Sequence, residues 1–303
     1  MSKYNYVMSY INPDTDGIAC SIAMAKLLSN KKEKWIPIIL GGIGEKTIFI
    51  LRELGIPFPE RNLLLDKAEK IVLVDTHHKT QLPERFPYNN VIAIIDHHPN
   101  GDEDLFPYAK IINKKIGAAA SFVANMYFEN EIKDKSVLQL LAFAILSNTL
   151  NFSAPSSTDY DRIIFNKINA IAPISVDLIN GMFEQRSLIL KADIYTAICA
   201  DFKVFDTKKG KVGISQIEAY NLESMIDISC YADTLNQIAI EKNIKFCLFN
   251  GVDIKSKRSL VIAAKQQSRE LLCSIFQLKE CREYQIFNRM LLRKTDFVPL
   301  LND

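Results

Sequence analysis

The sequence is short of net charge, of long apolar runs and of patterned cysteines, and each absence excludes a class of protein. Its 37 Lys and Arg residues nearly balance 35 Asp and Glu residues, so a net charge of +2 leaves no footprint for nucleic acid or a membrane surface. No apolar stretch is long enough to span a bilayer, and the N-terminus lacks the features of a signal peptide. The six cysteines show neither metal-ligand nor disulfide spacing. We therefore expect a cytoplasmic protein that binds no nucleic acid and no membrane.

What is present fits two globular domains. The chain has 303 residues, of which 48% are hydrophobic and 24% charged. In the first part, apolar strand-like runs alternate with helical patterns, which predicts an α/β fold with a parallel sheet flanked by helices. We expect strands at 5–11, 35–40, 71–74 and 91–95, and helices at 18–29, 46–54, 117–128 and 136–150.

The patterning changes after residue 187. We therefore expect a first domain at 1–187, a connector at 188–194 and a smaller α/β domain at 195–303. The second part carries a small excess of Lys and Arg, which suits a phosphate-containing substrate. Its expected elements are a hairpin formed by 202–205 and 211–217, a helix at 224–242, and strands at 245–250 and 259–264.

All four histidines lie in two pairs, and each pair follows an apolar strand. Residues 96–98 (Asp-His-His) end the run at 91–95, and residues 75–78 (Asp-Thr-His-His) end the run at 71–74. A third acidic cluster, 12–17 (NPDTDG), follows the first strand and opens a helix. Open α/β sheets bind ligands at the carboxyl ends of their strands, and carboxylates with some imidazole suit Mn²⁺ or Mg²⁺. An Asp after a strand can also cap a helix, and a His pair can be a satisfied core feature, but three such clusters together favour a metal site.

The motifs at 12–16 (NPDTD), 74–75 (VD) and 96–98 (DHH) together resemble the DHH phosphoesterase superfamily, and most of all its manganese-dependent (family II) inorganic pyrophosphatases. The likeness covers nearly the whole chain, including 117–120 (GAAA), 145–155 (ILSNTLNFSAP), 293–294 (RK) and 298–301 (VPLL). It implies two Mn²⁺ ions (or Mg²⁺ or Co²⁺) on the N-terminal domain, a C-terminal DHHA2-like domain that closes over the phosphates, and a homodimer formed through the N-terminal domain.

The resemblance also implies a role for each matching residue. The implied metal ligands are Asp14, Asp16, Asp75 and His97, with Asp75 bridging both ions. The implied phosphate contacts are His98, Lys203, Arg293 and Lys294, and catalysis would depend on Asp75, His98, Lys203 and Arg293. The chemistry agrees, because two ions about 3.5–4 Å apart convert a bridging water to hydroxide. An arginine fork and lysine point charges bind phosphate oxygens. The alternative for Arg293 and Lys294 is a solvated basic pair.

Two positions depart from the family pattern. Tyr10 stands where the family has a histidine ligand of the first metal, and Asn148 stands where it has an aspartate ligand of the second. A phenol titrates near 10 and cannot replace imidazole near neutral pH, whereas the Asn148 amide oxygen remains a neutral ligand. We therefore expect weakened metal binding. His77 or His78 either compensates as a ligand or forms a partly exposed loop pair hydrogen-bonded to carboxylates.

The sequence thus predicts a metal-dependent phosphohydrolase that cleaves a phosphoanhydride, with inorganic pyrophosphate as the leading substrate. A first alternative is hydrolysis of short polyphosphate or of a nucleotide phosphoester. A second is a catalytically weak protein that binds phosphate ligands for regulation.

Overall fold

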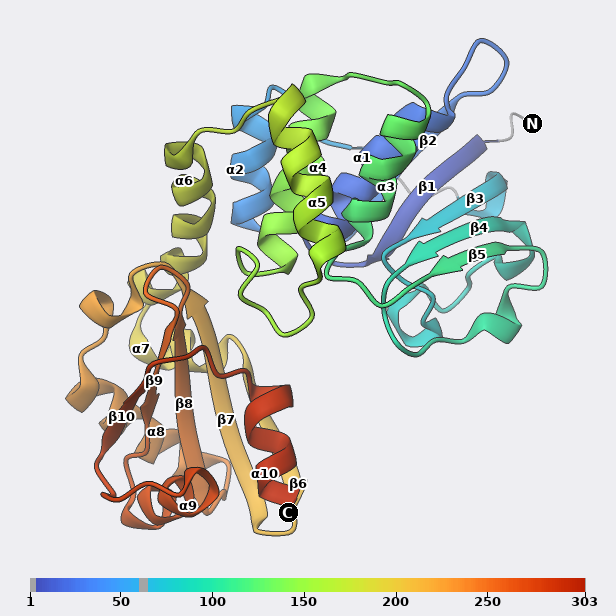
Figure 1. Cartoon of the computed structure of the whole chain (residues 1–303). Helices are drawn as coiled ribbons and strands as arrows, with labels where there is room; N and C mark the ends of the chain where they lie inside the picture. Colours follow the sequence, from blue (N-terminus) through green and yellow to red (C-terminus); the bar gives the residue numbers. More distant parts are fainter. Residues whose placement is uncertain (1–3, 60–64, 303) are drawn as a thin grey trace. The chain divides into compact units, whose positions relative to one another are not determined.

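The computed structural model describes residues 4–59 and 65–302, and it divides the chain into two compact units, Met1–Met182 and Phe183–Asp303. Each unit is built around one five-stranded sheet (Figure 1). Residues 188–194, for which the sequence suggests a connector, lie within the second unit, because Ile189, Leu190 and Ile194 pack against its core. No helix in the described ranges is long and apolar enough to cross a membrane.

The sheet of the N-terminal unit is entirely parallel, with the strand order β2-β1-β3-β4-β5. Its strands are β1 (Tyr4–Ile11), β2 (Trp35–Leu40), β3 (Ala68–Val74), β4 (Val91–Asp96) and β5 (Lys110–Asn113). The last four residues of β3 are all buried, as expected for a strand covered on both faces. The α/β class and the four strands expected from the sequence are confirmed.

Helices cover one face of this sheet (Figure 1). They are α1 (Thr15–Leu28) and α3 (Ala119–Glu129), which contact the strands, with α2 (Glu45–Glu53), α4 (Lys135–Asn148) and α5 (Asp159–Ile171) packed on other helices of the layer. The helix α6 (Val176–Arg186) follows and crosses the division between the units. Helix α1 packs on β1 and β2 and contacts α3 and α4. Gly17 allows this close packing, because a Cβ atom there would lie 2.4 Å from Ser9 Oγ.

Loops with short 3-10 turns cover the other face. These turns are η1 (Leu65–Lys67), η2 (Lys79–Gln81), η3 (Tyr88–Asn90) and η4 (Glu103–Leu105). Leu82, Phe86 and Phe106 come from these loops and join the buried cluster against β1, β3 and β4. The central strands are therefore buried from both sides, and their carboxyl ends carry the expected site.

The sheet of the C-terminal unit is mixed, with the strand order β10-β9-β8-β7-β6. Only the β7–β8 pair is parallel. The strands are β6 (Phe202–Thr207), β7 (Gly210–Ala219), β8 (Phe246–Asp253), β9 (Arg258–Ile262) and β10 (Tyr284–Phe287). The expected hairpin is confirmed, with Thr207 opposite Gly210 at its turn.

Two hydrophobic clusters fill the two sides of this second sheet. The helical segments are η5 (Ser187–Lys191), α7 (Ile194–Cys199), η6 (Leu222–Met225), α8 (Ile228–Glu241), α9 (Gln266–Phe276), the π-helical turn η7 (Arg293–Phe297) and α10 (Val298–Asn302). The helix expected at 224–242 begins later, at Ile228, because Asp227 caps it by accepting a hydrogen bond from the Cys230 backbone N–H.

Candidate metal centre

The loops that follow β1, β3 and β4 meet at one edge of the parallel sheet. These three strands are neighbours in the sheet, so the loop at 12–17, the residue Asp75 and the motif at 96–98 are brought together. Atoms of Asp75, Asp96, His97 and His98 that are able to bind a metal lie within 4.8 Å of one another. These acids and imidazoles therefore lie together at the strand ends, as the argument from parallel strands predicts.

Asp14 and Asp16 are held by helix N-termini. Asp14 caps α1, and its Oδ1 accepts hydrogen bonds from the backbone N–H groups of Asp16 (2.8 Å) and Gly17 (3.2 Å). Asp16 is buried and accepts from the backbone N–H groups of Ala119 (2.8 Å) and Ala120 (2.9 Å) at the start of α3. The positive end of α3 thus stabilises the Asp16 carboxylate.

Small residues at 117–120 make this approach possible. A Cβ atom on Gly117 would lie 2.6 Å from Thr149 Cγ2 and 2.7 Å from Asp161 Oδ2. The Gly117 N–H instead donates to Asp161 Oδ2 at 2.8 Å, and Ser121 Oγ donates to the other oxygen at 2.6 Å. Asp161 therefore anchors the loop that delivers the N–H groups of α3 to Asp16.

Asp75 is buried, and one oxygen of its carboxylate has no hydrogen-bond donor in the described structure. Its backbone has φ 60°, the left-handed region that a non-glycine residue rarely adopts. Its side chain is 2% exposed, and its Oδ1 has no hydrogen-bond donor among the residues that the structure describes. His97 Nε2 lies 3.2 Å from this oxygen. A buried carboxylate oxygen without a donor marks a place for a cation.

His97 is oriented for ligation. Its Nδ1 lies 2.9 Å from the Ile116 carbonyl, which can only accept, so the proton is on Nδ1. Nε2 then faces the acids, 3.2 Å from Asp75 Oδ1 and 3.9 Å from Asp16 Oδ2. A metal-binding histidine commonly has its other nitrogen fixed by a carbonyl in this way.

Asp96 organises the loop rather than facing the acids. It is fully buried, and its Oδ1 accepts from the backbone N–H groups of His97 (2.6 Å) and His98 (3.2 Å) and from His98 Nδ1 (2.8 Å). Its Oδ2 accepts from His77 Nδ1. Burial alone raises the pKa of Asp96, but the hydrogen bonds from His98 and His77 hold it well below its usual value. Asp96 belongs to the motif at 96–98 but not to the metal ligands or phosphate contacts that the resemblance implies.

Burial and neighbouring charges shift the pKa values of Asp16, Asp75 and His97. Burial raises the pKa of Asp16 to about 6, against the opposing effect of His97. Burial and the neighbouring Asp16 raise the pKa of Asp75 well above its usual value. Burial alone would lower the pKa of His97, but the carboxyl groups of Asp75, 3.2 Å from its Nε2, and of Asp16 raise it to about 10. The site therefore holds protons that a divalent cation would replace.

The two departures from the family pattern occupy their positions without offering a strong ligand. The Tyr10 hydroxyl accepts a hydrogen bond from the Asp14 backbone N–H at 3.1 Å. Burial, with the charges of Asp14 and Asp75, raises the pKa of Tyr10 far above its ordinary value, so it stays a neutral phenol. Asn148 Nδ2 donates to Asp16 Oδ2 and to the Gly117 carbonyl, both at 3.1 Å. Asn148 therefore supplies hydrogen-bond donors where a carboxylate would supply charge.

His77 and His78 lie in the loop after β3. His77 is 1% exposed and turned toward Asp96, while His78 stacks on it with ring centroids 5.4 Å apart. His77 is thus hydrogen-bonded to a carboxylate, as in the second alternative, but it is buried rather than partly exposed. The oxygen and imidazole donors of the site, with the unpaired oxygen of Asp75, fit a divalent cation such as Mn²⁺.

The three basic residues expected to bind phosphate lie in the C-terminal unit. Lys203 and Lys294 are exposed, and Lys203 Nζ is 3.7 Å from Asp201 Oδ1. Arg293 is only 4% exposed. Its guanidinium donates to both carboxylate oxygens of Asp201 at 2.9 Å and to the backbone carbonyls of Asp201 (2.6 Å) and Ile214 (3.1 Å). The Arg293 guanidinium, which is expected to bind phosphate, is thus hydrogen-bonded to Asp201 instead.

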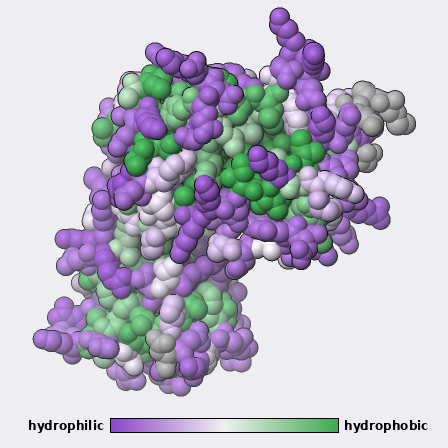
Figure 2. Space-filling model, turned by 45° about the vertical axis from the view of Figure 1, so that its right-hand side comes forward, coloured by the Kyte–Doolittle hydropathy of each residue, from purple (hydrophilic) through white to green (hydrophobic). Residues whose placement is uncertain are grey.

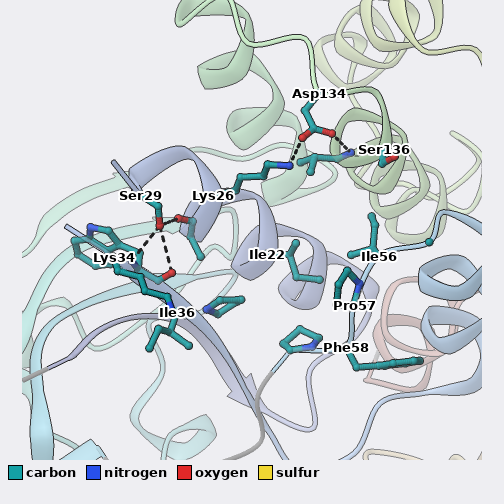
Figure 3. Close-up of a pocket in the computed structure, with 16 residues that line it drawn as sticks. Ile22, Lys26, Ser29, Lys34, Ile36, Ile56, Pro57, Phe58, Asp134 and Ser136 are labelled. Atoms are coloured by element: carbon teal, nitrogen blue, oxygen red, sulfur yellow. Dashed lines mark hydrogen bonds and ion pairs between the residues drawn. The ribbon is translucent and has the colours of Figure 1, made fainter. Parts of the chain in front are cut away.

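A separate cavity of about 590 Å³ lies on the N-terminal unit between α1, β2 and the start of α4 (Figure 3). Ile22, Ile36 and Pro57 form part of its apolar wall, and Lys26 forms an ion pair with Asp134 at its rim. None of its described lining residues belongs to the expected metal or phosphate set. The cavity is therefore distinct from the metal centre.

Comparison with known proteins agrees with the site and fold. The DHH family, N-terminal domain, matches residues 5–145, and the DHHA2 domain matches residues 180–303. A manganese-dependent inorganic pyrophosphatase of Methanocaldococcus jannaschii is 35% identical over 236 residues, 73% of each chain. One from Methanothrix thermoacetophila is 27% identical over 308 residues, 99% of this chain and 98% of the relative.

Solved structures give the same result. A Methanococcus jannaschii family II inorganic pyrophosphatase superposes with a TM-score of 0.69 at 28% identity, over 98% of both chains. An exopolyphosphatase-related protein of Bacteroides fragilis shares the fold, with a TM-score of 0.51 at 15% identity over 91% of this chain and 84% of that one. The fold and the strand-end site are those of a DHH phosphoesterase. Within that superfamily, the chain belongs to the family of manganese-dependent inorganic pyrophosphatases.

Proposed function

We propose that this chain hydrolyses inorganic pyrophosphate to phosphate, using Mn²⁺ or, in its place, Mg²⁺ or Co²⁺. The observation that carries the proposal is the buried Asp75 Oδ1, which has no donor in the described part of the chain and lies 3.2 Å from His97 Nε2. A cation held by both atoms would satisfy a buried oxygen that otherwise has no donor. The names of the relatives point to manganese and pyrophosphate.

Five residues would hold the metal. They are Asp14, Asp16, Asp75, His97 and Asn148, with Asp75 as the residue shared between two ions. When bound, divalent cations supply an activated water and neutralise charge on the phosphates. Asp16 keeps its orientation through the N–H groups of α3, and His97 through the Ile116 carbonyl. Because Tyr10 adds no ligand and Asn148 adds no charge, we expect these ions to bind more weakly than in a site with the full family pattern.

The substrate would be contacted by residues with exposed donors. His98 is 38% exposed at its side chain, and donation of its Nδ1–H to Asp96 leaves Nε2 available at the edge of the site. Lys203 and Lys294 are exposed cations of the C-terminal unit that suit phosphate oxygens. Arg293 donates to both carboxylate oxygens of Asp201 in the present structure. We propose that Arg293 also contributes to phosphate binding, and that the extent of this contribution depends on its pairing with Asp201.

A turnover screen tests the proposal. The purified chain is assayed with pyrophosphate, tripolyphosphate and nucleotides, each with Mn²⁺, Mg²⁺, Co²⁺ or a chelator. We expect metal-dependent release of phosphate that is fastest with pyrophosphate. Faster turnover of tripolyphosphate or of a nucleotide would show that this compound, and not pyrophosphate, is the preferred substrate. Binding of pyrophosphate without turnover would support a regulatory protein instead.

We also propose a cytoplasmic homodimer formed through the N-terminal unit. The six cysteines are free, as suits a reducing compartment. β5 is an edge strand, and beside it lies a groove of about 460 Å³ whose lining includes Ile112, Ile116 and Phe122. Figure 2 shows apolar side chains gathered on one face of this unit among hydrophilic ones. Light scattering on the purified chain would give a mass near twice 34.4 kDa if the proposal holds.

A further inference from the structure

His77 is a buried histidine to which neither the strand-end motif nor the relatives' names give a task. Its side chain is 1% exposed, and its Nδ1 donates to Asp96 Oδ2. The backbone around it is fixed as well, because the Asp102 N–H donates to the His77 carbonyl at 2.9 Å. Gly101 lies directly against the ring, since a Cβ atom there would fall 1.8 Å from Nε2. The ring therefore has one place, with Nδ1 toward Asp96 and Nε2 covered.

Asp96 connects this ring to the loop that carries His98. One carboxylate oxygen accepts from His77, and the other accepts from the His97 and His98 backbone N–H groups and from His98 Nδ1. The orientation of the carboxylate therefore sets the orientation of the His98 ring. With His77 in place, neither oxygen of Asp96 is free to turn toward another donor.

His97 does not depend on this chain of contacts to the same degree. Its ring is held by the Ile116 carbonyl, which belongs to a different segment. His98, in contrast, is 38% exposed, and the one hydrogen bond of its ring among the described residues goes to Asp96. Loss of His77 should consequently disturb His98 more than the metal ligand beside it.

We propose that His77 is a positioning residue for the reaction, which fixes the His98 ring at the edge of the site through the Asp96 carboxylate. The proposal rests on the proposed function, because it gives His98 the contact with the substrate. It adds a residue that lies outside the expected ligand and phosphate sets. It also explains why a glycine follows at position 101, where any side chain would displace the ring.

Two substitutions separate positioning from packing. His77→Phe keeps a flat ring but removes the donor, whereas His77→Asn keeps an N–H group where Nδ1 lies. His78→Phe is the matched control, because the His78 ring has no hydrogen bond among the described residues and a phenyl ring keeps its ring contacts with His77 and His98. We expect His77→Phe to lower kcat for pyrophosphate by about 10–100-fold, the usual effect of losing such a supporting contact. We expect His77→Asn to restore most of that loss, with Mn²⁺ affinity nearly unchanged in both variants and His78→Phe close to wild type.

Nitrogen-15 NMR of labelled histidines in the metal-free protein gives a second readout that needs no turnover. We expect wild-type His77 and His98 to carry their protons on Nδ1, and His98 to become a mixture of tautomers in His77→Phe. A wild-type His98 protonated on Nε2 would overturn the proposal even if no variant folds. Equal losses of kcat in His77→Phe and His77→Asn would also overturn it, since they would indicate packing. If the wild type does not cleave pyrophosphate, the proposed function fails, while the NMR result still decides whether His77 orients His98.

Discussion

The two units differ in how their buried charged groups are paired. In the N-terminal unit, Asp16 and Asp75 are buried close to each other, and Asp75 Oδ1 lacks a donor among the described residues. In the C-terminal unit, the buried Arg293 is already matched by both oxygens of Asp201 and by two backbone carbonyls. The first cluster therefore leaves a buried carboxylate oxygen for a cation, whereas the second already pairs its buried charge and leaves Arg293 Nε without an acceptor among the described residues. Both clusters contain residues of the family motifs, and they differ in which of their buried charged groups are already paired.

The largest expected effect tests whether the N-terminal cluster is built for a cation. Asp75→Asn should lower turnover of pyrophosphate about 1000-fold or more, because it removes the carboxylate proposed to touch both ions. The same change removes a buried acid whose ionised form is disfavoured by burial and by Asp16, so the metal-free protein should unfold at the same temperature as wild type or higher. Steady-state kinetics at saturating Mn²⁺ and thermal unfolding in chelator measure the two effects.

Asp161→Asn is the matched control for this substitution. Asp161 is also fully buried, but its carboxylate accepts from Gly117, Ser121 and Thr158. Its loss should destabilise the metal-free protein by about 1–3 kcal/mol, because buried donors lose their acceptor. If Asp75→Asn destabilises as much as Asp161→Asn and costs less than about tenfold in turnover, Asp75 is a structural acid and the contrast between the two clusters disappears.

A second prediction restores the family pattern in the N-terminal cluster. Tyr10→His combined with Asn148→Asp should tighten Mn²⁺ binding by about 10–100-fold and raise pyrophosphatase activity. The reason is that each change returns one ligand to a site already formed by Asp16, Asp75 and His97. Calorimetric titration with Mn²⁺ measures the affinity, and Tyr10→Phe, which adds no ligand, should leave it unchanged. An unaltered affinity in the double variant would mean that other groups already complete the site.

The third prediction concerns pH. His97 must be neutral to bind a metal, and its pKa in the metal-free protein is raised from 6.5 to about 10. Mn²⁺ should therefore displace a proton near pH 7–8, and its apparent affinity should rise about tenfold per pH unit there. A raised histidine pKa stabilises the fold fully below pH 6.5, and this contribution is lost as the pH rises through about 10. The raised pKa of Asp75 acts in the same direction, so the metal-free protein should lose stability as pH rises.

Calorimetry in buffers of different ionisation enthalpy counts the released protons. Release of about one proton or more per bound ion is expected at pH 7.5. An affinity that does not change between pH 7 and 8 would show that His97 is already neutral in the metal-free protein. The acids near His97 would then raise its pKa less than their distances suggest.

These tests also bear on what the sequence could predict. The strands β1, β2, β3 and β4 were predictable because their apolar runs are long and mostly buried. β5 was not predicted, since it has only four residues and none of them is fully buried. The helix α5 was missed, although its capping box of Thr158 and Asp161 is a readable start signal.

In the site, sequence reasoning placed Asp75 and His97 together because parallel strand ends meet. The pairing of His77 with Asp96 depends on where two rings turn, which no spacing records. The pairing of Arg293 with Asp201 joins positions 92 residues apart and depends on the completed second sheet. Contacts of this kind follow from packing rather than from motif, so the sequence showed which residues matter but not which of them are already satisfied.

The smallest expected effects separate the basic residues of the C-terminal unit. Lys203→Ala removes an exposed cation, so it should raise KM for pyrophosphate severalfold and leave the melting temperature unchanged. Arg293→Ala should raise KM as well, but it should also destabilise the protein by about 1–3 kcal/mol, because the Asp201 and Ile214 carbonyls lose a buried donor. Mn²⁺ affinity should stay the same in both variants, since no cation binds to a guanidinium or an ammonium. Kinetics, thermal unfolding and Mn²⁺ titration on the same preparations measure all three quantities. If Arg293→Ala raises KM without any loss of stability, its pairing with Asp201 contributes nothing to the fold, and the C-terminal cluster is as open to a ligand as the N-terminal one.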